Sequence, residues 1–115
     1  MTQYIYKICS SEEWETSQKL GVFQGSEIDL LDGFIHFSPL NLLESTVEKH
    51  FPKRMGVILE IDASDMEDIV WEEARGGQLF PHLYRPFDTR VVSKVYDLRA
   101  DLQSLVRSRN GNNVE

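Results

Sequence analysis

The chain has 115 residues, of which 41% are hydrophobic and 27% charged, as is typical of one soluble globular domain. Its formal net charge of −7 argues against binding of a nucleic-acid backbone as the main activity. The longest purely aliphatic run, residues 57–59, excludes a transmembrane helix, which needs about 20 apolar residues. A single cysteine, Cys9, excludes an intramolecular disulfide and a CxxC motif. No basic and apolar leader opens the chain, so we expect a cytoplasmic protein.

Charge is unevenly distributed along the chain. Residues 1–74 carry 5 basic and 15 acidic side chains, whereas residues 75–115 carry 7 basic and 4 acidic side chains. The basic surplus in the last third can attract an anionic group of a ligand, or it can pair with the acidic part of the same chain. The sequence leaves both interpretations open.

The first third of the chain predicts a strand, a helix and a loop. Residues 4–8 are rich in β-branched and aromatic side chains, which favours a strand. Ser10 and Glu13 have the spacing of a capping box, so a helix should begin there, and Gly21 should end it. Residues 21–32 contain two glycines and several acidic groups, and we expect them to form a loop.

A second strand and a second helix should follow. Residues 33–37 are expected to form the strand, and Ser38 followed by a proline is typical of a helix N-terminus. Three apolar residues spaced three and four apart predict one buried helical stripe: Leu40, Leu43 and Val47. The helix should end near His50, because a proline follows two residues later.

The second half predicts mostly strands. Residues 55–61 form the clearest strand and should lie inside a sheet, because their apolar side chains do not alternate with polar ones. Residues 69–72 and 91–98 are expected to be strands. Residues 79–86 contain two prolines and should be an edge strand or an ordered loop. A short helix is expected from Asp101.

These elements predict one compact α+β domain over residues 1–108. It should have a mixed or antiparallel sheet and two or three helices, because strands and helices do not alternate regularly. Residues 109–115 lack apolar anchors and are expected to form a disordered tail.

The first candidate functional segment is residues 32–38. Alternate side chains of a strand share a face, so Ile35 and Phe37 should point into the core, and His36 and Ser38 should lie together on the other face. Imidazole exchanges protons near neutral pH, and a neighbouring hydroxyl can help to orient a polar ligand. The alternatives are a structural histidine and a serine that only caps the following helix.

The second candidate segment is residues 71–86. It contains Glu72, Arg75, His82 and Tyr84 within sixteen residues, and its prolines stiffen the backbone that carries them. We expect His36 and His82 to lie close together, because each stands in the most distinctive motif of its half. The alternative is an edge segment whose aromatic rings only cover the core. The histidine spacings do not fit a metal site, so no metal is expected.

The segments 33–38 and 77–84 resemble the two signature motifs of a bacterial family called domain of unknown function 952. Residues 4–8 and the Trp71-Glu72 pair also resemble it, so that the similarity covers about residues 3–100. The resemblance implies a grouping by fold with ADP-ribosyltransferase-like domains, which have a split, twisted sheet and an NAD cleft between its halves.

The same resemblance implies where particular residues lie in that cleft. Tyr6 or Lys7 would lie on the first strand near the cleft. His36 and Ser38 would lie on the second strand of the cleft. Glu72, His82 and Tyr84 would lie near the nicotinamide. NAD is therefore the cofactor that the resemblance implies, although fold alone does not determine function.

Two functions remain open. As an enzyme, the protein would use NAD or a nucleotide, with His36 and His82 transferring protons and Glu72 stabilising positive charge on a ribose. As a binding module, the same cleft would hold a small metabolite or a peptide without turnover. Arg75, and also Arg85, would contact an anionic ligand, unless Arg75 pairs with neighbouring carboxylates. We expect neither a nucleic-acid nor a membrane partner, and the sequence does not determine the oligomeric state.

Overall fold

A computed structural model describes residues 2–74 and 76–111 of the chain. Four α-helices occur in this part: α1 (Ser11–Leu20), α2 (Glu27–Asp32), α3 (Leu40–His50) and α4 (Leu98–Gly111). The strands are β1 (Tyr4–Cys9), β2 (Val22–Phe23), β3 (Ile35–His36), β4 (Ser38–Pro39), β5 (Val57–Asp62), β6 (Val70–Glu73), β7 (Leu79–Leu83), β8 (Phe87–Asp88) and β9 (Val92–Asp97). Two short 3-10 turns span Ala63–Asp65 and Thr89–Val91.

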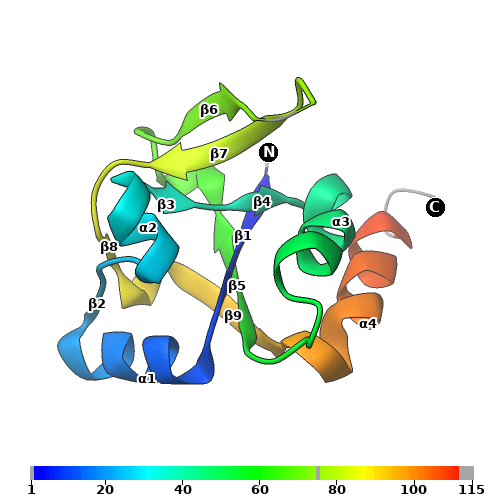
Figure 1. Cartoon of the computed structure of the whole chain (residues 1–115), viewed down its shortest axis with the longest axis horizontal. Helices are drawn as coiled ribbons and strands as arrows, with labels where there is room; N and C mark the ends of the chain where they lie inside the picture. The colour runs from blue at the N-terminus through cyan, green and yellow to red at the C-terminus, as the bar shows by residue number, and fades with distance from the viewer. Residues whose placement is uncertain (1, 75, 112–115) are drawn as a thin grey trace.

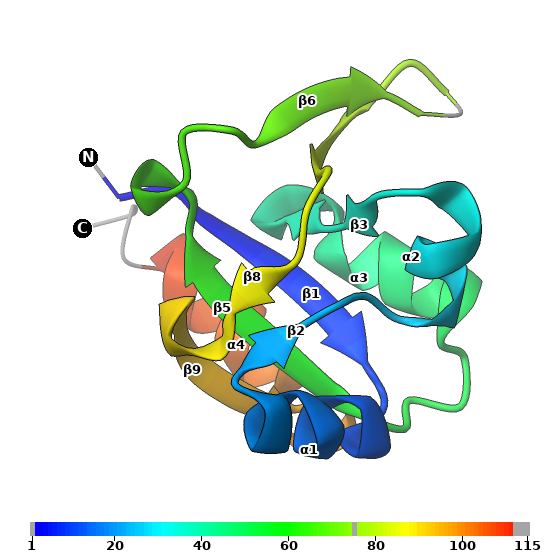
Figure 2. The ribbon, with the colours of Figure 1, turned by 90° about the vertical axis from the view of Figure 1, so that its left-hand side faces the viewer.

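The strands form three antiparallel sheets. The largest has the order β4-β1-β5-β9, a second has the order β3-β7-β6, and the third pairs β2 with β8. The chain passes from the second sheet to the first within a few residues, because β3 and β4 are separated only by Phe37. This arrangement confirms the predicted α+β class with antiparallel strands, although the described part has four helices and not the two or three expected (Figures 1 and 2).

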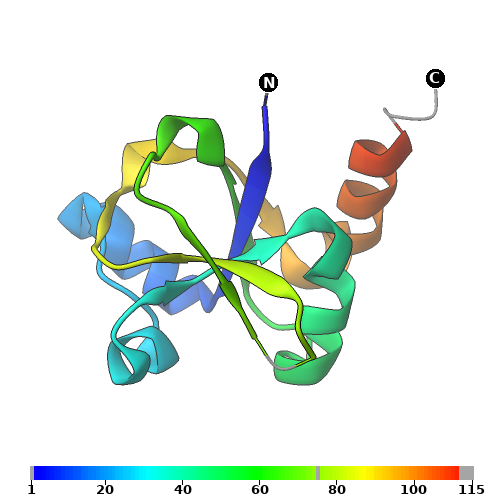
Figure 3. The same cartoon turned by 90° about the horizontal axis from the view of Figure 1, so that it is seen from above.

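The large sheet separates two hydrophobic clusters. Ile5 and Leu59 face one cluster, with β2, β3, β7 and β8. Tyr6 and Ile58 face the other, where α3 and α4 pack side by side (Figure 3). Strand β5 lies between β1 and β9, and both its faces are covered. This position explains its unbroken apolar run and confirms the prediction of a central strand.

The first helix begins and ends as its sequence predicts. The Ser10 hydroxyl accepts a hydrogen bond from the Glu13 N–H, and the Glu13 carboxylate accepts one from the Ser10 N–H. Gly21 has a φ of +80°, a left-handed conformation that costs glycine little and suits it to end the helix.

The prediction of a loop over residues 21–32 is wrong. This segment contains β2 and the short helix α2. The Asp29 carboxylate accepts a hydrogen bond from the Ser26 N–H at 2.8 Å, three residues earlier, which stabilises the first turn of α2. Aspartate stands here where the usual capping box has glutamate or glutamine, and this substitution conceals the helix start.

The boundaries around Ser38 also differ from expectation. Ser38 belongs to β4, where it pairs with Tyr6, and the N-cap residue of α3 is Pro39. The Ser38 hydroxyl donates to the Pro39 carbonyl, so it does not cap the helix. Ile35 and Phe37 are buried, as alternation predicts. The buried residues of α3 are Leu42, Leu43 and Val47, whereas Leu40, also predicted in this stripe, is only half-buried at the first position of the helix.

Strand β7 is not an edge strand, because it lies between β3 and β6. Its Pro81 carbonyl accepts a hydrogen bond from the Phe37 N–H at 3.0 Å. An antiparallel pair of this kind normally exchanges two such bonds, but proline has no N–H to return the second. The missing donor is tolerated because the pairing of β3 with β7 ends there.

The C-terminal helix begins at Leu98, three residues before the predicted start, and continues to Gly111. Arg109, expected in a disordered tail, contacts buried Glu60 with two nitrogens at 2.7 and 3.0 Å. The tail prediction is therefore wrong for residues 109–111, and residues 112–115 lie outside the described part. No helix among the described residues is long and apolar enough to cross a membrane.

Candidate functional site

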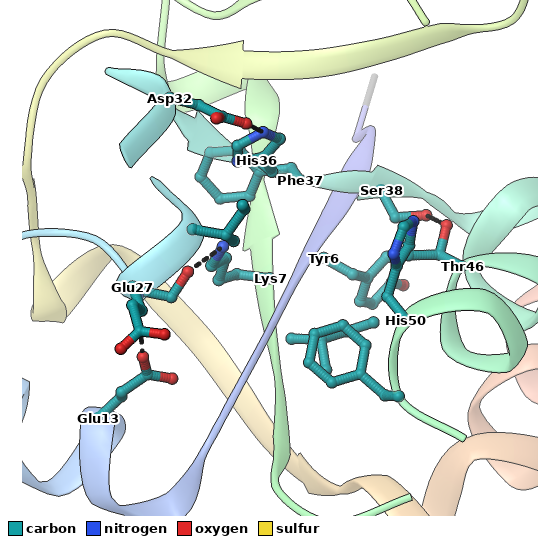
Figure 4. A pocket seen from close by; sticks show the side chains of 14 residues that line it. Tyr6, Lys7, Glu13, Glu27, Asp32, His36, Phe37, Ser38, Thr46 and His50 are labelled. Atoms are coloured by element: carbon teal, nitrogen blue, oxygen red, sulfur yellow. Dashed lines mark hydrogen bonds and ion pairs between the residues drawn. The ribbon is translucent and has the colours of Figure 1, made fainter. Parts of the chain in front are cut away.

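A pocket of about 580 Å³ opens beside β1. Strand β4 pairs only with Ile5 and Tyr6, so beyond Tyr6 this edge of β1 has no partner strand among the described residues. Helices α2 and α3 stand on either side of the open edge (Figure 4). The lining comprises Tyr6, Lys7, Ile8, Glu13, Ser26, Glu27, Ile28, Asp32, His36, Phe37, Ser38, Thr46, His50 and Phe51.

A buried carboxylate organises one wall of the pocket. Asp29 is 2% exposed, and its Oδ2 lies 2.6 Å from Nζ of Lys7, which is also buried. Its Oδ1 accepts from the His36 N–H and lies 2.7 Å from His36 Nδ1. Burial by itself raises the pKa of Asp29, but the bonds from His36 and Lys7 outweigh it and hold the pKa well below its usual value.

His36 contacts a second carboxylate at the rim. Its Nε2 lies 3.0 Å from Oδ2 of Asp32, whose side chain is 44% exposed, whereas that of His36 is 32% exposed. Each ring nitrogen thus lies within hydrogen-bonding distance of a carboxylate, and the ring remains accessible from the pocket. Such a ring can transfer a proton or donate a hydrogen bond to a ligand.

The two ends of the pocket differ in charge. Glu13, Glu27 and Asp32 line the end next to α1 and α2, and Lys7 at its floor is neutralised by Asp29. The other end, next to α3, presents Ser38, Thr46 and His50. One end therefore suits a cationic group, and the other supplies hydroxyl and imidazole hydrogen bonds without a carboxylate (Figure 4).

The second predicted motif forms a neighbouring cluster. Pairing of β3 with β7 sets His82 opposite His36, with ring centroids 5.5 Å apart, which confirms that the two lie close together. Oε1 of Glu72 lies 2.6 Å from Nδ1 of His82 and accepts from the Tyr84 hydroxyl at 2.6 Å. The hydroxyl and His82 hold the pKa of Glu72 below its usual value. Phe34 packs against both imidazoles and the Tyr84 ring.

The structure separates the predicted site residues into two groups. Tyr6, His36 and Ser38 line the pocket, whereas Glu72, His82 and Tyr84 do not. The Tyr6 hydroxyl donates to Glu60 at 2.9 Å, so Tyr6 presents its ring rather than a free hydroxyl; burial, together with the bond to Glu60, raises its pKa.

The two candidate arginines do not line the pocket. Arg85 pairs with Asp68 through a bond of 2.9 Å and a second, shorter one, so its guanidinium already has an anionic partner. Arg75 lies outside the described residues. Within the described part of the chain, no group of three His, Cys, Asp or Glu side chains could hold a metal ion.

Sequence reasoning missed Asp29, Thr46 and His50. Asp29 stood in an expected loop, and its spacing from Ser26 was the available signal. Thr46 and His50 lie one helical turn apart on α3, so they share a face. Nothing in the sequence showed that this face would border a pocket.

Antiparallel sheets, flanking helices and a histidine-lined pocket define a small α+β domain with a candidate ligand site. The chain belongs to the family described as Protein of unknown function (DUF952), whose model matches residues 8–95. The search of curated proteins gave no match.

Two solved structures of one relative share this fold. The crystal structure of protein CC0527 from Caulobacter crescentus has a TM-score of 0.80 and 41% identity, and the match covers 90% of this chain and 97% of that one. The solution NMR structure of CC0527 has a TM-score of 0.73 and 43% identity, over 82% of this chain and 83% of that one.

Proposed function

We propose that the pocket beside β1 binds a nucleotide with a cationic ring, NAD in the first instance, and that the protein is a transferase- or hydrolase-like enzyme. The observation that carries this proposal is the difference in charge between the two ends of the pocket. A cytoplasmic location and an ADP-ribosyltransferase-like fold, both expected from the sequence, belong to the same proposal.

The shape and charge of the pocket suit such a ligand. Its volume of about 580 Å³ falls within the usual range of small-molecule sites. Oxidised NAD has a pyridinium cation at one end and a pyrophosphate nearer its middle. The carboxylates of Glu13, Glu27 and Asp32 favour the pyridinium, and His50 can donate a hydrogen bond to a phosphate oxygen. The Ser38 and Thr46 hydroxyls donate to backbone carbonyls and can accept hydrogen bonds from the ligand.

The same side chains supply the elements of a reaction. Breaking the bond between ribose and pyridinium leaves positive charge on the ribose, which a nearby carboxylate stabilises. Asp32 is the pocket carboxylate that contacts His36. His36 would take a proton from the attacking hydroxyl or water. This assignment moves the charge-stabilising role from Glu72, which does not line the pocket, to Asp32.

One observation favours a second function, binding without turnover. Glu72 and His82, expected to complete the catalytic group, stay outside the pocket lining. The Ser38 hydroxyl donates to a backbone carbonyl and makes no hydrogen bond to a histidine among the described residues, so it is not activated as a nucleophile. In this case the pocket would hold a small metabolite and release it unchanged.

Calorimetric titration with oxidised NAD, reduced NAD and ADP-ribose tests the proposal. Oxidised NAD should bind most tightly, because reduced NAD has a neutral ring and ADP-ribose has none. Glu27→Gln should reduce this preference, and Glu44→Gln, which changes an exposed residue of α3 outside the pocket, should leave it unchanged. Equal affinity for the three ligands, or no binding, would overturn the proposal. Chromatographic detection of released nicotinamide then separates an enzyme from a binding module.

A further inference from the structure

The buried Asp29 contacts both the backbone N–H and the ring Nδ1 of His36, and the proposed reaction gives Asp29 no role. We propose that Asp29 is a positioning residue: it keeps the single proton of the neutral His36 ring on Nδ1, so that Nε2 is the atom that accepts a proton from the ligand. The proposal rests on the function proposed above, in which His36 acts as the base.

The geometry around Asp29 restricts the His36 backbone and ring together. Oδ1 accepts from the His36 N–H at 3.1 Å and lies 2.7 Å from Nδ1 of the same residue. Oδ2 accepts from the Ser26 N–H at 2.8 Å and lies 2.6 Å from Lys7 Nζ. The Asp29 carboxylate thus connects β1, α2 and β3. Because both of its oxygens have partners, the carboxylate is held in one position beside the imidazole.

Asp29 and Asp32 can each accept a hydrogen bond from the His36 ring, but they differ in burial. The Asp29 side chain is 1% exposed, whereas that of Asp32 is 44% exposed and lies farther from the ring. A hydrogen bond to a buried carboxylate is stronger than one to a carboxylate that water can solvate. When the ring has one proton, that proton therefore stays on Nδ1, next to Asp29.

This arrangement determines the direction of proton transfer. With Nδ1 protonated, Nε2 has a lone pair, which cannot hydrogen-bond the Asp32 carboxylate. When that exposed carboxylate turns away from Nε2, a hydroxyl of a bound ligand can give its proton to Nε2 as its oxygen becomes a nucleophile. The resulting imidazolium has a carboxylate at each nitrogen. Lys7 balances the charge of Asp29 at the floor of the pocket.

Ring ¹⁵N spectra of His36 test the proposal without a ligand. In the wild type, at a pH at which the ring is neutral, the proton should reside on Nδ1. Lys7→Met combined with Asp29→Ala removes the buried carboxylate with its counter-ion, and the proton should move to Nε2, next to Asp32. Lys7→Met with Asp29→Asn restores an acceptor at the same place and should return the proton to Nδ1. Asp32→Ala is the matched control and should leave it on Nδ1.

Each outcome is decisive. A wild-type ring with its proton on Nε2 overturns the proposal even if no double variant folds, and so does a proton that stays on Nδ1 in the Asp29→Ala variant. Oxidised NAD is titrated separately into the wild type. Absence of NAD binding with the expected ring spectra contradicts the proposed function alone, whereas binding with the opposite spectra contradicts the role of Asp29 alone.

Discussion

His36 and His82 are direct neighbours across the β3–β7 pair, with ring centroids 5.5 Å apart, although 45 residues separate them in the chain. Phe34 covers both rings, at centroid distances of 4.5 and 4.2 Å. Yet only His36 lines the pocket, and His82 is bound to Glu72 outside it. Proximity alone therefore does not make the two histidines one site.

The two histidines should behave differently when each is replaced by alanine. His36→Ala should weaken binding of oxidised NAD about tenfold, equivalent to about 1.4 kcal/mol, because it removes a hydrogen-bonding group from the pocket. His82→Ala should leave the affinity unchanged. Calorimetric titration of both variants, with melting curves to show that each is folded, measures the difference. An equal loss in the two variants would show that both imidazoles contact the ligand.

Leu43 should be among the residues most sensitive to truncation. Its side chain is fully buried between α3 and the large sheet, so Leu43→Ala should lower the free energy of unfolding by about 2–5 kcal/mol. Leu31→Ala is the matched control, because Leu31 is 77% exposed and should change stability by less than about 0.5 kcal/mol. Denaturant melts measure both. Similar small losses would place the α3 stripe on the surface.

The contact between Arg109 and Glu60 should stabilise the end of the chain. Glu60 is 1% exposed, and Arg109→Ala leaves its carboxylate with the Tyr6 and Tyr96 hydroxyls as hydrogen-bond donors among the described residues. We expect a loss of about 3 kcal/mol, near the lower limit for breaking a buried ion pair, because the Arg109 side chain is 27% exposed. Arg107→Ala, at an exposed position of α4, should have little effect in the same melts. Equal melts of the two variants would contradict this role.

Asp29 should make stability depend on acid pH. Its pKa is lower in the folded state than the value of about 3.9 expected when unfolded, so the unfolded chain binds the proton more readily. Its contribution is therefore complete above about pH 5 and is lost as the pH falls through and below 4, with a limiting slope of about 1.4 kcal/mol per pH unit. Urea melts between pH 3 and 6 should show a shallower slope for Asp29→Asn than for the wild type. Parallel slopes would show that Asp29 does not contribute.

Gly56 occupies a position that no side chain can share. Its φ is +127°, and a Cβ there would overlap the backbone carbonyl of Cys9. We expect Gly56→Ala to cost more than about 3 kcal/mol, because backbone rather than a flexible side chain must move. Gly76→Ala is the control for backbone strain alone: φ is +91°, nothing lies within 4 Å, and the cost should be about 1–2 kcal/mol. Thermal or urea melts of the two variants should differ accordingly, and equal costs would contradict the steric argument.

Local chemistry was sufficient to predict several elements from the sequence. The capping box of Ser10 and Glu13, the end of α1 at Gly21 and the central strand β5 depend on spacing and composition within a few residues. The alternation that buries Ile35 and Phe37 is equally local. The expectation that His36 and His82 meet was also confirmed, although it rested on how distinctive their motifs are and not on a physical coupling.

Only the tertiary structure decided where the pocket lies. Asp29 contacts both Lys7 and His36 because α2, β1 and β3, which carry these three residues, pack against one another. No spacing in the sequence indicates that these three elements meet. His50 borders the pocket because β4 begins only at Ser38, opposite Tyr6, and leaves the edge of β1 beyond Tyr6 open between α2 and α3. Strand length and sheet edges depend on long-range pairing, so composition and periodicity determined the elements, whereas packing determined the site.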